Sequence, residues 1–190
     1  MTAAGADRRW WRRVRPLLRW IEHALAVVGL GMLLFSVGFD LSRVVSGSMS
    51  PTLCGDDWQS GDLVLTERVS YWFRRPRRWE VVGFRDQQGT QIMKRVVGLP
   101  GEHVQIDRTG GLWIDGKPLA RPAELKPVRY FAYGNLDFSQ AAPCGDGYYV
   151  LGDDSRDSDD SRFNGPVKPG QILGRPWLIL TPAEHRGMVR

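Results

Sequence analysis

An unbroken apolar run near the N-terminus constrains the fold and the location of this chain more than any other feature. No ionisable side chain lies between His23 and Asp40. Counted from Trp20, the run has close to the ~20 residues that an α-helix needs to cross ~30 Å of hydrocarbon. We therefore expect a transmembrane anchor over residues 20–39, preceded by an arginine-rich tail over residues 1–19 and followed by the main domain over residues 40–190.

The tail accounts for the charge of the whole chain. Residues 1–20 contain six arginines and one aspartate, and the chain has a formal net charge of +5. The remaining residues therefore sum to zero, whereas a nucleic-acid-binding domain concentrates basic side chains on its folded surface. We expect no nucleic-acid partner. Because basic residues beside an apolar span stay in the cytoplasm, the tail is predicted to be cytoplasmic and the main domain extracytoplasmic.

Two other interpretations of the apolar run stay open. A basic stretch before a short apolar run is also typical of a cleavable signal peptide, and Ser36-Val37-Gly38 has the small-x-small pattern of a cleavage site. A helix buried in the core of a domain has a similar composition and length. The signal peptide, like the anchor, would place the main domain outside the cytoplasm, and the core helix would not.

After Asp40 the pattern changes from helical to strand-like. Short β-branched or aromatic segments, separated by glycine, proline and aspartate, are typical of antiparallel strands and turns. The predicted strands cover residues 62–67, 81–84, 91–97, 103–107, 112–114 and 148–151, with a helical pattern only near 69–73 and an irregular excursion over 120–147. The expected fold is an all-β domain of short antiparallel strands with one N-terminal transmembrane helix.

Cys54 and Cys144 are the only cysteines. An exported domain permits a disulfide between them, and the sequence leaves open whether they pair. Neither cysteine has the Cys-x-x-Cys spacing of a metal site, so we expect no bound metal.

A serine-rich turn follows the apolar run within a few residues, with the sequence Ser46-Gly47-Ser48-Met49-Ser50-Pro51-Thr52-Leu53. A serine hydroxyl needs an adjacent base before it can act as a nucleophile. The chain has three histidines, which lie at the membrane edge, on a strand and near the C-terminus, and it has no Gly-x-Ser-x-Gly elbow. A Ser–His–Asp triad is therefore not expected.

Lys94 is the alternative base. Strand alternation places it on one face with Ile92 and Val96. Burial among apolar neighbours lowers the pKa of a lysine, because desolvation disfavours the ammonium form. Taken alone, the residue is also compatible with an edge-strand lysine that extends into water.

An acidic loop comes directly after the last predicted strand. Residues 152–162 hold five aspartates and three serines. Such a composition is typical of a solvated surface or a calcium site, but no glutamate closes the loop at the offset that an EF-hand requires. Its start at the end of a core strand suits groups that orient a catalytic side chain.

Together these stretches resemble the type I signal peptidases, the Ser–Lys proteases that trim exported proteins. The resemblance covers the domain from end to end. It rests on residues 46–53, Gly61-Asp62-Leu63-Val64-Leu65, residues 94–102, residues 152–162 and Asn164-Gly165-Pro166-Val167.

The resemblance implies a role for individual residues in a membrane-bound serine endopeptidase that needs no cofactor. Ser48 would be the nucleophile and Lys94 its general base. Ser46 would lend a hydroxyl to the oxyanion hole, and Ser158 would orient Lys94 through a hydrogen bond. The supporting ion pairs would be Asp160 with Arg162 and Asp153 with Arg95.

The same resemblance implies the partners and the location. The substrates would be exported preproteins with small residues at positions −3 and −1 of the cleavage site. The enzyme would cross the bacterial cytoplasmic (inner) membrane once, with its active site on the periplasmic side. Seven residues separate Asp40 from Ser48, so the site would lie within ~25 Å of the lipid bilayer at ~3.5 Å per residue.

Two departures from the family pattern leave alternatives open. Asp154 and Ser155 stand where many members have asparagine and arginine, and the second span and long insertion of the larger bacterial enzymes are missing from this sequence. A specialised peptidase for conjugative pilin or another narrow set of substrates is one alternative. A repressor-type Ser–Lys autoprotease and a non-catalytic, membrane-tethered β domain that binds partners through its acidic loop are the others.

Overall fold

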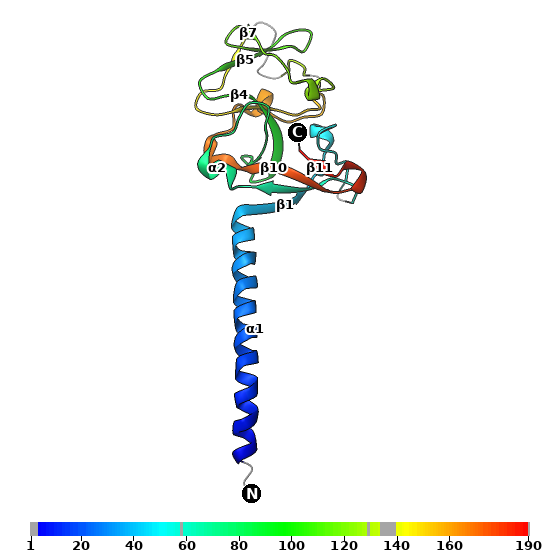
Figure 1. The fold of residues 1–190 in the computed structure, drawn as a ribbon. Coiled ribbons are helices and arrows are strands. Elements are labelled where there is room, and N and C mark those ends of the chain that lie inside the picture. The colour runs from blue at the N-terminus through cyan, green and yellow to red at the C-terminus, as the bar shows by residue number, and fades with distance from the viewer. Residues whose placement is uncertain (1–3, 58, 129, 134–139, 190) are drawn as a thin grey trace. The chain divides into compact units, whose positions relative to one another are not determined.

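The computed structural model describes residues 4–57, 59–128, 130–133 and 140–189 (Figure 1). The side chains of residues 4–10, 12 and 13 lie outside this description, and with them four arginines of the predicted tail. The chain divides into two compact units, residues 1–38 and residues 39–190.

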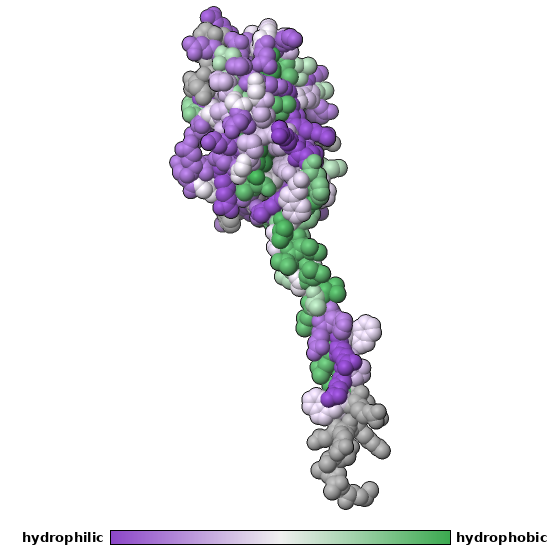
Figure 2. Space-filling view, turned by 90° about the vertical axis from the view of Figure 1, so that its left-hand side faces the viewer, coloured by the Kyte–Doolittle hydropathy of each residue, from purple (hydrophilic) through white to green (hydrophobic). Residues whose placement is uncertain are grey.

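The first unit is a single helix, α1 (Ala4–Gly38), with Pro16 inside it. Its segment Val14–Gly38 is long and apolar enough to cross a membrane, with a mean hydropathy of 1.8 over its most apolar stretch, of which 6% is buried. Figure 2 shows the apolar band of this helix as a continuous green surface with a polar stretch on its N-terminal side. The low burial contradicts the core-helix interpretation, whereas an anchor and a signal peptide both agree with it. The helix ends at Gly38, and Phe39 already belongs to the first strand.

The second unit contains a main antiparallel sheet. Within the described residues it has seven strands in the order β1-β2-β10-β3-β4-β9, with β11 paired to β10. The strands are β1 (Phe39–Arg43), β2 (Leu63–Glu67), β3 (Val81–Arg85), β4 (Gln91–Gly98), β9 (Tyr149–Leu151), β10 (Ile172–Thr181) and β11 (Gly187–Met188).

A smaller antiparallel sheet has the strand order β7-β6-β5-β8. It is built from β5 (His103–Ile106), β6 (Leu112–Ile114), β7 (Lys117–Pro118) and β8 (Ala142–Pro143). Helical segments in the domain are one turn long: α2 (Ser70–Phe73), α3 (Ser161–Asn164) and the 3₁₀ turns η1 (Gly47–Met49), η2 (Ala123–Leu125), η3 (Pro169–Gln171) and η4 (Ala183–His185).

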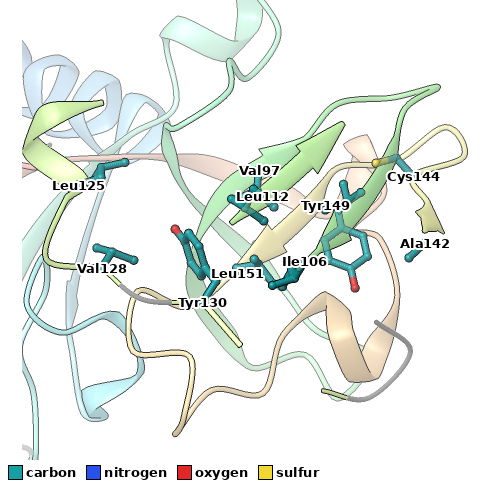
Figure 3. Packing of buried hydrophobic residues seen from close by; sticks show 11 residues of the cluster. Val97, Ile106, Leu112, Leu125, Val128, Tyr130, Ala142, Cys144, Tyr149 and Leu151 are labelled. Atoms are coloured by element: carbon teal, nitrogen blue, oxygen red, sulfur yellow. The ribbon is translucent and has the colours of Figure 1, made fainter. Parts of the chain in front are cut away.

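Three apolar clusters of described residues hold the sheets together. The largest lies between the second sheet and the C-terminal half of β4 with β9, and Figure 3 shows how its side chains meet there. Val97, Val104, Ile106, Tyr149 and Leu151 are fully buried in it. The other two clusters lie on opposite faces of the main sheet, one around Met49, Leu53 and Val64, the other around Val82, Val96 and Val150.

The predicted fold class, an all-β domain of short antiparallel strands with one N-terminal apolar helix, is confirmed. Each of the six predicted strands has a counterpart, and the helical pattern near residues 69–73 corresponds to α2. The prediction missed β1, β7, β8, β10 and β11, of which β8 lies in the stretch over 120–147 that was expected to be irregular. Cys54 and Cys144 are both free thiols, the first exposed and the second buried, so the disulfide that the sequence left open is not formed.

Gly98 lies where β4 leaves the main sheet and meets the second one. A Cβ atom on this residue would lie 2.4 Å from Val104 Cγ2, 2.6 Å from Cys144 Sγ and 2.9 Å from Tyr149 Cβ. Each of these neighbours is itself buried, so none has room to move.

We predict that Gly98→Ala lowers the free energy of unfolding by about 1–3 kcal/mol, because the added methyl overpacks the junction of the two sheets. Thermal unfolding of the full chain in detergent measures the effect. Gly170→Ala is the matched control, since a Cβ there meets open space. Equal melting temperatures for the two variants would contradict this account of the junction.

Candidate active site

The serine-rich turn folds into η1, directly after β1. The N–H of Ser50 bonds to the carbonyl of Gly47 at 2.8 Å, and the N–H of Leu53 bonds to the carbonyl of Met49 at 2.9 Å. Met49 and Leu53 are buried in the apolar cluster that also contains Val64, and their burial anchors the turn on the main sheet. Ser48 is 7% exposed.

Lys94 lies in the middle of β4. It is opposite Val82 on β3, and pairing with β9 begins one residue later, at Arg95. The side chain is 3% exposed. Its Nζ donates a hydrogen bond to Ser48 Oγ at 2.7 Å, which is the geometry that a serine nucleophile and its base require.

Burial changes the acidity of Lys94. Loss of solvent lowers the pKa of its amine to about 8, and the charge of Arg162 acts in the same direction. The carboxylates of Asp160, Asp159 and Asp153 oppose this effect. A substantial fraction of the amine is therefore neutral near pH 8, where an exposed lysine is almost fully charged.

Ser46 is exposed, and its Oγ lies 3.2 Å from Ser48 Oγ. The first N–H groups of a helical turn have no partner within the turn, which includes the N–H of Ser48 in η1. The Ser46 hydroxyl and this N–H are thus two possible donors beside the Ser48 side chain, and the first of them is the donor that the family resemblance implied for an oxyanion hole.

The acidic loop forms a closed network around Asp160. Arg162 contacts both carboxylate oxygens at 2.8 Å, and Gly152 N–H and Ser158 Oγ donate to Oδ2 at 2.9 and 2.7 Å. Neither side chain of the Asp160–Arg162 pair is exposed. Among the described residues, Lys94 Nζ bonds to Ser48 and not to Ser158 as predicted, and the Ser158 hydroxyl donates to Asp160.

A second buried ion pair joins the lysine strand to the serine turn. Arg95 donates to both oxygens of Asp153, at 2.8 and 2.6 Å, and both side chains have no exposed surface. Thr52, four residues after Ser48, accepts from Arg95 at 3.0 Å and donates to Asp153 at 2.5 Å. The N–H of Asp154 also bonds to the carbonyl of Ser48 at 3.1 Å. Arg95, the residue after Lys94, thereby holds the turn that carries Ser48 in place.

The sequence did not reveal the part of Thr52, although this residue lies inside the motif that drew attention to Ser48. Gly152 was also missed as a site residue. A Cβ atom there would lie 2.1 Å from Ser158 Oγ and 2.5 Å from the carbonyl oxygen of Ser48, so only glycine fits between the turn and the acidic loop.

Comparison with known proteins places the chain in a family. A family model described as "Signal peptidase, peptidase S26" matches residues 17–181. The chain belongs to this signal peptidase family. The repressor-type autoprotease considered above is therefore rejected.

Individual relatives agree with the family assignment. The chain is 31% identical to a probable signal peptidase I-2 of Synechocystis, over 92% of this chain and 79% of the relative. It is 30% identical to signal peptidase I V of Bacillus subtilis, over 82% of this chain and 94% of the relative. A crystal structure of a signal peptidase I from Enterococcus faecalis is 31% identical, covers 57% of this chain and 98% of its own, and superposes with a TM-score of 0.43.

In this signal peptidase family member a groove of about 630 Å³ opens beside Ser48 and Lys94. One wall comes from β1 and the residues after it, and the other from the first half of β4. The lining residues are Leu41, Ser42, Arg43, Val44, Val45, Ser46, Ser48, Met49, Leu63, Thr90, Gln91, Ile92, Met93 and Lys94. Gln91 Nε2 donates to Asp40 Oδ2 at 3.0 Å and so connects the two walls.

One group of side chains in the described part of the chain could approach a metal ion. The ligand atoms of Cys54, Asp62 and His185 lie within 4.8 Å of one another. The carboxylate is already used: Asp62 Oδ2 accepts from Cys54 N–H at 2.8 Å and lies 2.8 Å from His185 Nδ1. These bonds tie the C-terminal segment to the start of β2.

We predict that Asp153→Ala lowers the free energy of unfolding by roughly 3–5 kcal/mol, because it leaves the charge of Arg95 buried without its partner. Urea unfolding of the full chain in detergent measures the loss. Asp154→Ala is the control, since the neighbouring Asp154–Arg156 pair lies at the surface with 3.6 Å between the charged atoms. It should cost less than about 0.5 kcal/mol. Similar losses in the two variants would contradict the central place of the Arg95–Asp153 pair.

Proposed function

We propose that the protein is a membrane-anchored serine endopeptidase that removes signal peptides from exported preproteins, with Ser48 as nucleophile and Lys94 as general base. The observation that carries this proposal is the 2.7 Å contact between two buried groups, Lys94 Nζ and Ser48 Oγ. Membership of the signal peptidase family supports the reaction and the kind of substrate.

Acylation begins when the neutral amine of Lys94 accepts the proton of the Ser48 hydroxyl. The serine oxygen then attacks the scissile carbonyl carbon, and the π electrons of the C=O bond move onto the carbonyl oxygen. The Ser48 N–H and the Ser46 hydroxyl donate to that oxygen and stabilise its negative charge. When the tetrahedral intermediate collapses, the C–N bond breaks and the proton held by Lys94 goes to the leaving amine.

Deacylation repeats the sequence with water as the nucleophile. Lys94, neutral again, takes a proton from the water, which attacks the ester carbonyl. The serine oxygen leaves with the proton returned by Lys94, and the freed carboxylate is the end of the signal peptide. Every proton is moved by one amine, so the reaction needs no metal or organic cofactor.

The Asp160 network supports the base indirectly. A free carboxylate beside Lys94 would stabilise the ammonium form and remove the base. Asp160 is instead satisfied by Arg162, Ser158 and the Gly152 N–H, which spread its charge over several donors. We assign Ser158 and Arg162 as positioning residues that act on Lys94 through Asp160.

The groove suits an extended peptide. β1 is an edge strand, and within the described residues the first half of β4 pairs with β3 alone. A substrate strand can therefore form main-chain hydrogen bonds along these edges, as in β-strand addition. Apolar side chains such as Val44, Leu63 and Met93 line the groove and favour small apolar residues at the −3 and −1 positions.

The charge distribution supports a single-pass topology in the cytoplasmic membrane. The arginine-rich segment lies on the N-terminal side of the span and favours the cytoplasm. The peptidase domain would then face the extracytoplasmic side, where signal peptides emerge.

We predict that Ser48→Ala abolishes cleavage of a preprotein with an Ala-x-Ala site, and that Lys94→Ala lowers kcat/KM by at least about 10²–10⁴-fold, the usual contribution of a general base. The assay uses the full chain in detergent. Ser60→Ala and Lys117→Ala, at exposed positions, are matched controls and should keep full activity. Appreciable cleavage by either active-site variant would reject the Ser–Lys assignment.

A precursor with phenylalanine at −1 should resist the wild-type enzyme, and its cleavage would reject the proposed preference for small residues.

We predict that kcat/KM rises with pH up to about 8 and then levels, because only neutral Lys94 is a base and burial lowers its pKa to about 8. Below that value each pH unit should cost close to tenfold, since the neutral fraction falls by about that factor. The profile is measured with one precursor under kcat/KM conditions. A profile that stays flat between about pH 5 and pH 9 would show that another group is the base.

A further inference from the structure

The most exposed large apolar side chain in the described part of the chain is Phe73, with 84% of its surface accessible, and its neighbour Trp72 is 58% exposed. Both belong to α2. Arginines follow at once, at positions 74, 75, 77 and 78. We call residues 70–78 the aromatic–arginine segment.

The segment is held firmly from inside the domain. Glu80 Oε2 accepts from Tyr71 Oη at 3.2 Å, from Arg74 Nη1 at 2.9 Å and from the N–H of Arg77 at 3.0 Å. Arg78 is bound to Glu102 at 2.5 Å. Trp72 and Phe73 are therefore exposed on a turn whose backbone and neighbouring side chains are fixed by these bonds.

Two of the four arginines are left for an external partner. Arg74 and Arg78 form the ion pairs just described, whereas Arg75 and Arg77 are exposed and form no ion pair with any described residue. Two guanidinium groups beside two exposed aromatic rings are complementary to a partner that has anionic groups at its surface and an apolar interior directly beneath them. The headgroup boundary of a bilayer has that composition.

Strand register places the segment close to the point where the chain leaves the membrane. Phe39, the residue directly after α1, is paired with Glu67 at the end of β2. The segment begins three residues later, and Phe73 is six residues from Glu67, at most ~21 Å along an extended chain. Arg68 Nη2 also lies 3.7 Å from Asp40 Oδ1. In Figure 1 the α2 turn lies near the end of the domain that carries β1, and β7 is at the opposite end.

We propose that the aromatic–arginine segment is a second membrane attachment, in which Trp72 and Phe73 enter the headgroup boundary of an anionic phospholipid bilayer while Arg75 and Arg77 bind lipid phosphates. This proposal rests on the membrane anchoring of α1 proposed above. A domain held at one point can rotate about that point, and a second contact removes this freedom. The groove starts at Leu41, two residues after Phe39, so the second contact fixes its height above the bilayer.

The test uses the full chain in lipid nanodiscs, made of phosphatidylcholine alone or with one third phosphatidylglycerol. A spin label is attached at Phe73→Cys in a Cys54→Ser background, because Cys54 is exposed and Cys144 is buried. Collision rates with oxygen and with a water-soluble nickel chelate give the depth of the label. The matched control is a label at Lys117→Cys on β7, and a second variant, Trp72→Cys, covers a failure of the first to fold. Cleavage activity shows that each labelled variant is folded.

The label at residue 73 should lie about 5–10 Å inside the headgroup boundary, as in interfacial helices, and deeper with phosphatidylglycerol, while the label at residue 117 stays in water. Arg75→Gln/Arg77→Gln should remove the dependence on phosphatidylglycerol, and Lys117→Gln/Lys126→Gln should not. Co-elution with the disc reports α1 separately. A chain that co-elutes but keeps residue 73 as water-accessible as residue 117 would overturn the proposal. So would a phosphatidylglycerol dependence that survives the double arginine variant, or shielding that appears only when preprotein is added.

Discussion

The buried ion pair between Arg95 and Asp153 is the contact on which the geometry of the site depends. Both side chains are fully buried, so either charge alone would be strongly destabilising. Arg95 follows Lys94 in β4, Asp153 lies just after β9, and Thr52 of the serine turn bonds to both. The pair therefore connects three segments that are far apart in sequence. The 2.7 Å approach of Lys94 to Ser48 follows from this connection, because their neighbours are already fixed.

The electrostatics of the site follow from how its charges are paired. Lys94 is surrounded by carboxylates, which would ordinarily keep its amine charged. Arg95 and Arg162 neutralise Asp153 and Asp160, and burial then decides the outcome by lowering the pKa of Lys94. The two arginines thus let an acidic loop lie beside an amine whose pKa is lowered. The inner carboxylates of the loop, Asp153 and Asp160, already have arginine partners.

The sequence predicted the parts of the site that depend on local pattern. Alternation along β4 placed Lys94 on one face with Ile92 and Val96 but left an edge-strand lysine open. The resemblance of the motifs to the type I signal peptidases implied Ser48, Lys94 and both ion pairs. The sequence could not predict contacts set by long-range packing, such as the bonds of Thr52 to Arg95 and Asp153. The bond of Ser158 to Asp160 in place of Lys94 depends on a side-chain rotation that no spacing encodes. In the fold, β10 was missed because Gly174 and Pro176 interrupt its apolar run, and the structure accommodates the proline at a register shift.

The most direct test of the account is the titration of Lys94 itself. The full chain in detergent would be labelled with ¹³C at the lysine Cε positions, and the Lys94 signal would be assigned by its loss in Lys94→Arg and followed by NMR through the alkaline range. We predict a midpoint near the value of about 8 that burial imposes, well below that of the other lysines. A midpoint in the ordinary range of lysine, about 10.4, would contradict it, because the amine beside Ser48 would then be charged whenever the enzyme works.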